Sequence, residues 1–179
     1  MVREIVHDPM FLQRKSEDAT QADLQTAQDL LDTLRANFDR CVGMAANMIG
    51  VAKKIIAIND NGKYLVMFNP EIISKFGEFE TEEGCLSLDG ERKTVRYKTI
   101  KVKYFNENFK QIKRSFSDFT AQIIQHEIDH CNGILIPPGY NVWLSGFILH
   151  IYFAQKFYCN LFIATNFTVN LNLFGIIVL

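Results

Sequence analysis

The sequence predicts an α+β fold in which a mostly antiparallel β-sheet surrounds a central helix that binds a metal. Three observations lead to this prediction. Short segments rich in strand-forming residues lie between residues 55 and 116 and are separated by turn residues. A segment with helical periodicity precedes them, and a second one follows them. The second segment ends in two histidines, His126 and His130, four residues apart, which places both imidazoles on one face of a helix.

The first helix is expected over residues 23–37. Thr20 and Asp23 have the spacing of a capping box, with a side-chain oxygen at each end of the first turn. The apolar positions that follow recur every three or four residues: Leu24, Ala27, Leu31, Leu34 and Phe38. Such a stripe predicts a helix that packs one face against the sheet.

Four strands are expected over residues 55–58, 64–69, 99–106 and 110–116. Each is rich in β-branched and aromatic side chains. The runs Asn59-Asp60-Asn61-Gly62 and Asn106-Glu107-Asn108 separate neighbouring segments and are typical of turns. The strands are therefore expected to pair as hairpins.

The second helix is expected to begin at Ser117 or Asp118 and to run to about His130. Asn132 and Gly133 follow, and this pair is a common stop signal for a helix. The expected helix brings His126 and His130 to the sheet.

Length and composition are those of one small domain. The chain has 179 residues and a net charge of −1, which gives no electrostatic reason to expect DNA as a specific partner. Its four cysteines form no CxxC pair, which argues against a zinc ribbon or a disulfide scaffold and favours a reducing compartment. The first residues lack the apolar core of a signal peptide, so a cytoplasmic location is expected.

Residues 137–179 differ in composition from residues 1–136, which we take as the catalytic domain. After residue 136 the only charged side chain is Lys156, and Phe, Leu, Ile, Asn and Tyr dominate. The apolar run at 142–154 is too short to span a membrane, and asparagines interrupt the remainder. We interpret this tail as a frameshift product, with a genuine hydrophobic extension as the alternative, and membrane contact is expected only in the second case.

The run His126-Glu127-Ile128-Asp129-His130 is the HExxH pattern of metal-dependent hydrolases. Both histidines can reach one divalent ion, while Glu127 lies beside it as a general base. A catalytic site of this kind needs a third protein ligand and an open position for water.

The position of the third ligand distinguishes the classes that use this pattern. Thermolysin-like metalloproteases take a downstream carboxylate, but no Asp or Glu follows Asp129. Metzincins need a third histidine at position 136, where this chain has Ile136. An upstream ligand remains, and the candidate is Cys85 in the run Glu83-Gly84-Cys85-Leu86-Ser87. The metalloprotease hypothesis is thereby weakened.

Three motifs of this chain, in order, resemble those of the peptide deformylase family. The family carries a Gly-x-Gly-(Leu/Met)-Ala-Ala-x-Gln-x-Gly loop, a Glu-Gly-Cys-Leu-Ser strand and a Gln-His-Glu-x-Asp-His helix. This sequence has Cys41-Val42-Gly43-Met44-Ala45-Ala46-Asn47-Met48-Ile49-Gly50, then Glu83 to Ser87, then Gln125 to His130. The resemblance covers most of residues 1–136.

The resemblance implies an enzyme that removes the formyl group from the initiator methionine of nascent chains. Its cofactor would be one divalent metal ion, ferrous iron in the family, with Zn²⁺ or Ni²⁺ as alternatives, held by Cys85, His126 and His130. Glu127 would act as the acid and base, and the backbone N–H of Leu86 would stabilise the oxyanion.

Substrate contacts are also implied by the resemblance. An N-formylmethionyl peptide would pair with the strand edge that includes Gly43, Met44 and Ala45, near Gly84. The ribosome is a further expected partner, because the basic residues between Lys110 and Arg114 could contact ribosomal RNA.

One position departs from the family in a way that concerns catalysis. Met48 occupies the place of the glutamine whose side-chain amide helps to stabilise the oxyanion, and a thioether has no donor. Asn47 carries an amide, but in an extended segment its side chain would point to the opposite face. Cys41 replaces the first glycine of the loop.

These departures leave two hypotheses within the family. In the first, the chain is a deformylase of reduced activity. In the second, it is a catalytically silent member that binds peptides or regulates. In both, the chain resembles a divergent, secondary paralogue of the Gram-positive type. Asp129 is expected to be a structural partner of an arginine such as Arg96 and to have no catalytic role.

Overall fold

Five antiparallel strands, in the spatial order β1-β2-β3-β4-β5, form one sheet. The structure is a computed structural model that describes residues 1–60 and 62–135. The strands are β1 (Gly43–Ala45), β2 (Ile55–Asp60), β3 (Lys63–Cys85), β4 (Leu88–Phe105) and β5 (Gln111–Ser117). Consecutive strands are neighbours throughout, so the sheet is a meander, and the predicted hairpins are confirmed.

The two predicted helices are confirmed, and a short one precedes them. These helices are α1 (Pro9–Leu12), α2 (Leu24–Ala36) and α3 (Asp118–Cys131). A 3₁₀ turn, Gln21–Asp23, leads into α2, and there the backbone N–H of Thr20 donates to the Asp23 carboxylate at 2.7 Å. The capping box predicted at this place is therefore formed.

Strand β2 lies between the two long helices because its side chains are apolar on both faces. Ile55 and Ala57 pack into the core on the α2 side, whereas Ile56 and Ile58 pack with residues of α3. A strand buried on both faces is continuously hydrophobic, as β2 is over these four residues.

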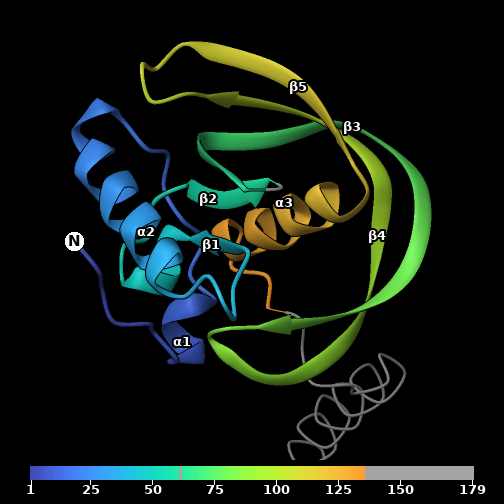
Figure 1. The fold of residues 1–179 in the computed structure, drawn as a ribbon, viewed down its shortest axis with the longest axis horizontal. Helices are drawn as coiled ribbons and strands as arrows, with labels where there is room; N and C mark the ends of the chain where they lie inside the picture. Colours follow the sequence, from blue (N-terminus) through green and yellow to red (C-terminus); the bar gives the residue numbers. More distant parts are fainter. Residues whose placement is uncertain (61, 136–179) are drawn as a thin grey trace, which may run out of the picture. The chain divides into compact units, whose positions relative to one another are not determined.

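Strands β3 and β4 are much longer than the sequence predicted, and with β5 they curve around α3 (Figure 1). Register shifts interrupt the pairing of β3 with β4 between Phe68 and Glu71 and again between Ile72 and Ser74. Irregularities of this kind bend a strand and increase its twist. The curved sheet thereby surrounds the helix, and the predicted arrangement of sheet and central helix is confirmed.

Just after helix α3, the chain comes close to the N-terminal segment at Gly133. The backbone of Gly133 has φ of +69°, and a Cβ there would lie 2.2 Å from the carbonyl oxygen of Gln13. Both the backbone conformation and the contact require a residue without a side chain.

Within residues 1–60 and 62–135, no helix is long and apolar enough to cross a membrane. The interpretation of residues 137–179 falls outside the described part of the chain.

Replacing Gly133 tests the close approach at the end of α3. Gly133→Ala is expected to lower the free energy of unfolding by about 2 kcal/mol or more, because it adds a backbone clash to the cost of positive φ. Gly62→Ala is the matched control, since Gly62 has φ of +88° and, among the described residues, no atom within 4 Å of its Cβ position. Urea unfolding of both variants checks this, and equal losses would refute the clash.

Candidate metal centre and catalytic site

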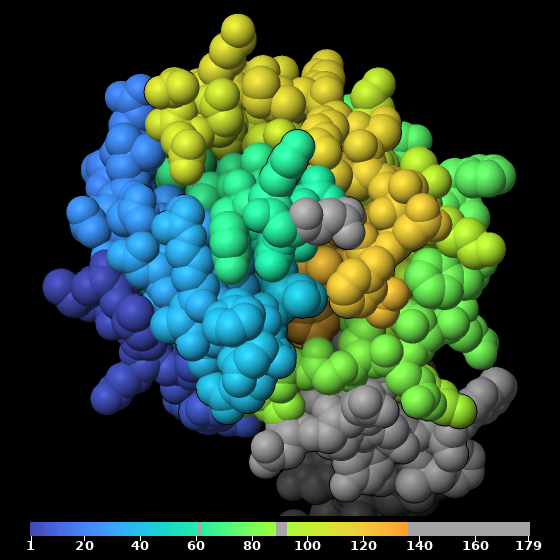
Figure 2. Space-filling model, in the orientation of Figure 1, coloured from blue at the N-terminus to red at the C-terminus, as the bar shows by residue number. Residues whose placement is uncertain are grey.

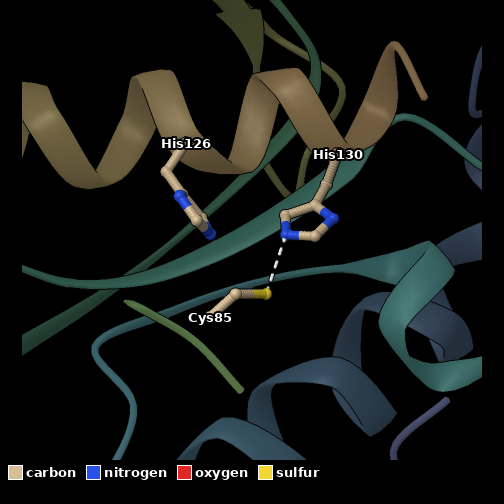
Figure 3. A group of neighbouring side chains, drawn as sticks. All are labelled: Cys85, His126 and His130. Atoms are coloured by element: carbon tan, nitrogen blue, oxygen red, sulfur yellow. Dashed lines mark hydrogen bonds between the residues drawn. The ribbon is translucent and has the colours of Figure 1, made fainter. Parts of the chain in front are cut away.

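Cys85, His126 and His130 come together beside α3, as the sequence predicted for metal ligands. The two histidines project from the same side of α3 toward Cys85 at the end of β3 (Figure 3). The ligand atoms of the three residues lie within 4.8 Å of one another, and Cys85 Sγ is 3.3 Å from His130 Nε2.

The donor set fits a divalent transition metal. One thiolate and two imidazoles leave a fourth position open in a tetrahedral site, which is the arrangement of catalytic metal centres. Burial and the neighbouring His126 lower the pKa of His130 to about 3, so its ring is neutral and can offer a lone pair.

Glu83 fixes the orientation of His126. Its carboxylate lies 3.0 Å from His126 Nδ1, so the other ring nitrogen is left for a metal. Burial would lower the pKa of His126, but hydrogen bonds with Cys85 and Glu83 outweigh it and raise the value to about 10. A metal must therefore displace a proton from this ring, which couples binding to pH.

Arg96 connects Glu83 to α3. Its guanidinium donates two hydrogen bonds of 2.8 Å to the Glu83 carboxylate and one of 2.6 Å to Asp129. Burial alone would raise the pKa of Glu83, but Arg96 and His126 lower it to about 2. The predicted structural pairing of Asp129 with Arg96 is confirmed.

Glu127 lies beside the three ligands and is 3% exposed. Its Oε2 has no hydrogen-bond partner among the described residues. Burial raises the pKa of Glu127 to about 7. Such a carboxyl group can both accept and release a proton near neutral pH.

Gly43 permits the close approach of β1 to Glu127. A Cβ on Gly43 would lie 2.8 Å from Glu127 Oε1 and 2.5 Å from a methyl carbon of Ile123. The glycine is therefore a steric requirement of the site.

A cavity of about 470 Å³ opens beside the candidate ligands. It is lined by the loop before β1, the end of β3 and the first turns of α3, and Figure 2 shows the hollow between these cyan, green and yellow-orange segments. Its walls include Gly43, Met48, Gly84, Leu86 and Glu127, all of which the sequence singled out.

Other predicted site residues do not line this cavity. His130 borders a smaller neighbouring cavity that it shares with Cys85 and His126. The side chains of Met44 and Ala45 are fully buried in the hydrophobic core. These two residues can therefore meet a peptide only through their backbone.

Met48 and Asn47 lie in a 3₁₀ turn, Ala46–Ile49, so the expectation of an extended segment is wrong. The Asn47 amide donates to the carbonyls of His130 and Leu12, at 2.8 and 3.3 Å. Those contacts hold it away from the cavity. Met48 lines the cavity, and its Sδ lies 3.4 Å from the backbone nitrogen of Ala45.

Sequence reasoning missed part of the cavity wall. Phe119, Gln122 and Ile123 lie seven, four and three residues before His126 and share its face of α3. The helical spacing could have found them. It could not have found Glu83 as the partner of His126, because that contact depends on how β3 curves.

Removal of single ligands tests the metal centre. Cys85→Ala, His126→Ala and His130→Ala are each expected to reduce bound metal strongly, because two ligands hold an ion poorly. Glu127→Ala should keep its metal and serves as the control. Metal analysis of the purified proteins checks this, and full occupancy in the Cys85 variant would exclude the thiolate as a ligand.

Replacing Arg96 tests the buried ion-pair network. Arg96→Met is expected to lower the free energy of unfolding by about 3 kcal/mol, because two acidic groups lose their partner, and to weaken metal binding about tenfold or more. Arg114→Met is the matched control, since Arg114 pairs with Asp60 on the surface of the same sheet. Equal effects in urea unfolding and metal titration would contradict a special role for Arg96.

Comparisons with known proteins agree with this geometry. The sequence model of the family "Polypeptide deformylase" matches residues 2–138. A peptide deformylase from Clostridium beijerinckii is 54% identical over 136 residues, which are 76% of this chain and the whole of that protein. One from Pseudothermotoga lettingae is 40% identical, with 75% and 81% covered.

Solved structures are similar as well. A peptide deformylase from Legionella pneumophila has a TM-score of 0.69 at 36% identity, covering 76% of this chain and 84% of that one. The class I type b peptide deformylase from Acinetobacter baumannii, solved bound to Met-Ala-Ser, has a TM-score of 0.69 at 28% identity, covering 76% and 97%. This chain belongs to the polypeptide deformylase family.

Proposed function

We propose that this chain is a metal-dependent hydrolase that removes the N-formyl group from the N-terminal formyl-methionine of nascent polypeptides. The proposal rests on one arrangement in a chain of this family: Cys85, His126, the buried Glu127 and the start of β1 line one cavity, and the third candidate ligand, His130, borders the neighbouring one.

The chemistry assigns Glu127 the proton transfers. A divalent metal held by Cys85, His126 and His130 would supply a Lewis acid and a water of lowered pKa. Glu127 accepts a proton from the attacking water and later delivers it to the leaving amine. Its pKa of about 7 suits both steps.

The oxyanion of the tetrahedral intermediate has one donor fewer than the family pattern provides. The backbone N–H of Leu86, at the cavity wall, is the donor that remains. The thioether of Met48 occupies the second place and cannot donate. Loss of one such donor costs about a hundredfold to a thousandfold in turnover, so we propose an enzyme of reduced activity.

The substrate peptide would lie along β1. This strand is at one end of the sheet order, so its outer edge can accept an extended chain through backbone hydrogen bonds. Gly84 allows a chain to pass close to the end of β3, because no atom of the described part of the chain lies within 4 Å of its Cβ position. The apolar wall of Phe119 and Ile123 suits a methionine side chain.

We propose ferrous iron as the metal, with Zn²⁺ or Ni²⁺ as alternatives. Two nitrogens and one sulfur suit all three ions, so the donor set does not rank them. The proposed location is the cytoplasm, where the thiolate ligand would remain reduced.

The ribosome is proposed as a second partner. Residues 93–117 contain eight Lys or Arg side chains and one acidic side chain, Glu107. Lys110, Lys113 and Arg114 are exposed on or beside β5, where they can meet phosphate groups of RNA.

We assign the activity to residues 1–136.

The alternative is a catalytically silent member of the family that keeps the metal and binds peptides. Met48 favours it, because the missing donor acts on the transition state and leaves peptide binding intact. The two alternatives differ in turnover and share metal content.

An assay with a formyl-Met peptide tests the proposal. Protein purified anaerobically and loaded with iron should release formate, and Glu127→Ala should lose that activity while it keeps the metal. Absence of turnover in the fully loaded wild-type protein would favour the silent alternative.

Restoring the amide at position 48 tests the cause of the reduced rate. Met48→Gln is expected to raise kcat by about a hundredfold with little change in metal content, because the new donor acts on the oxyanion formed in the transition state. Met48→Leu, which has no donor, is the control. A gain equal to that of the leucine variant would show that the amide does not act.

A further inference from the structure

The outer edge of β1 is defined by its pairing with β2. The Asn59 N–H donates to the Val42 carbonyl at 2.8 Å, so this pair of residues is hydrogen-bonded. Residues of antiparallel strands alternate between pairs that are bonded and pairs that are not. Gly43 and Ala45, which face Ile58 and Ile56, therefore direct their N–H and C=O groups away from β2.

Sulfur side chains of the same chain already contact both outward-facing residues. The Cys41 thiol donates to the Gly43 carbonyl, with Sγ at 2.7 Å from the oxygen. Met48 Sδ accepts from the Ala45 N–H at 3.4 Å. The two sulfur residues are seven positions apart in the sequence, and both line the cavity.

The thiol of Cys41 is suited to remain a donor. Burial, followed by the charge of Glu127, raises its pKa to about 12, so it stays protonated at neutral pH. Cys41 is half-buried, and its sulfur occupies space at the cavity wall as well as a lone pair of the carbonyl.

We propose that Cys41 lowers the affinity of this site for peptides, because its thiol competes with the N–H of an incoming chain for the Gly43 carbonyl. This inference rests on the proposed function in one respect, because it takes a formylmethionyl peptide as the chain that binds along the edge of β1. The buried Glu127, whose Oε2 lacks a hydrogen-bond partner among the described residues, borders the same cavity. The formyl end of that peptide is expected to lie beside this carboxyl group.

The bond that is exchanged is a neutral one. A peptide N–H that takes the place of the thiol breaks the thiol–carbonyl hydrogen bond, so the free energy gained on binding is reduced by that of one such bond. The free energy of one such hydrogen bond corresponds to a factor of about three to ten in an equilibrium constant. The effect falls on peptide binding and leaves the metal unchanged.

Cys41→Ala is the direct test, because it removes the thiol and keeps a Cβ. KM for a formyl-Met peptide should fall about three- to tenfold, and the Kd for Met-Ala-Ser, measured by calorimetry on the metal-loaded protein, should fall equally. Cys41→Ser keeps a donor of similar size, so its KM and Kd should stay within about twofold of the wild type.

The outcomes separate this inference from the proposed function. An unchanged or higher Kd for Met-Ala-Ser in Cys41→Ala, in a protein that unfolds at the same urea concentration as the wild type, would overturn the inference. If Cys41→Ala instead unfolds at a lower urea concentration than the wild type, the Cys41→Ser variant is decisive. A higher Kd for Met-Ala-Ser in both variants would also overturn the inference. Wild-type protein that binds Met-Ala-Ser but releases no formate would refute the proposed function, while tighter binding by Cys41→Ala would still support the role of the thiol.

Discussion

The candidate metal centre depends on one buried interaction, the contact of the Arg96 guanidinium with Glu83 and Asp129. Arg96 lies on β4, Glu83 on β3 and Asp129 on α3, so one side chain joins the curved sheet to the helix inside it. Burial of charges is costly unless hydrogen bonds compensate for it, and here Arg96 binds Glu83 through two of its nitrogens. Because Glu83 also contacts His126, the interaction that joins the sheet to the helix also orients a candidate metal ligand.

The helix can lie this deep in the sheet because glycines permit two close approaches of the backbone, one beside the helix and one just after it. Gly43 lets β1 approach Glu127 and Ile123, and Gly133 lets the chain after α3 meet the backbone of Gln13. Close packing leaves no room for an added methyl group at either place. Arg96 thus fixes the orientation of α3, and Gly43 and Gly133 allow the helix to pack close to the neighbouring backbone.

Local patterns predicted the parts of the structure that depend on spacing along the chain. The face of α3 with His126 and His130 follows from the helical period, and β2 follows from its apolar residues. The extension of β3 and β4 over residues 70–85 and 88–98 was not predicted from the sequence, although Glu78, Glu80 and Glu82 alternate with Phe79 and Thr81 as in a strand with one face in solvent. This segment owes its extended structure to cross-strand pairing and to the contact of β4 with α3. The role of Glu83 at His126 was missed for the same reason.

We propose that the two departures from the family loop, Cys41 and Met48, act on different stages of one reaction. Both sulfur atoms touch the outward edge of β1, yet only Met48 takes the place of a group that would bind the oxyanion. A contact that is lost only in the transition state lowers kcat, whereas competition for the ground-state peptide raises KM. The residues should therefore be separable in kinetics although they lie on the same strand edge. An enzyme that carries both residues would have a low kcat and a high KM, and neither effect would require any change in the metal ligands.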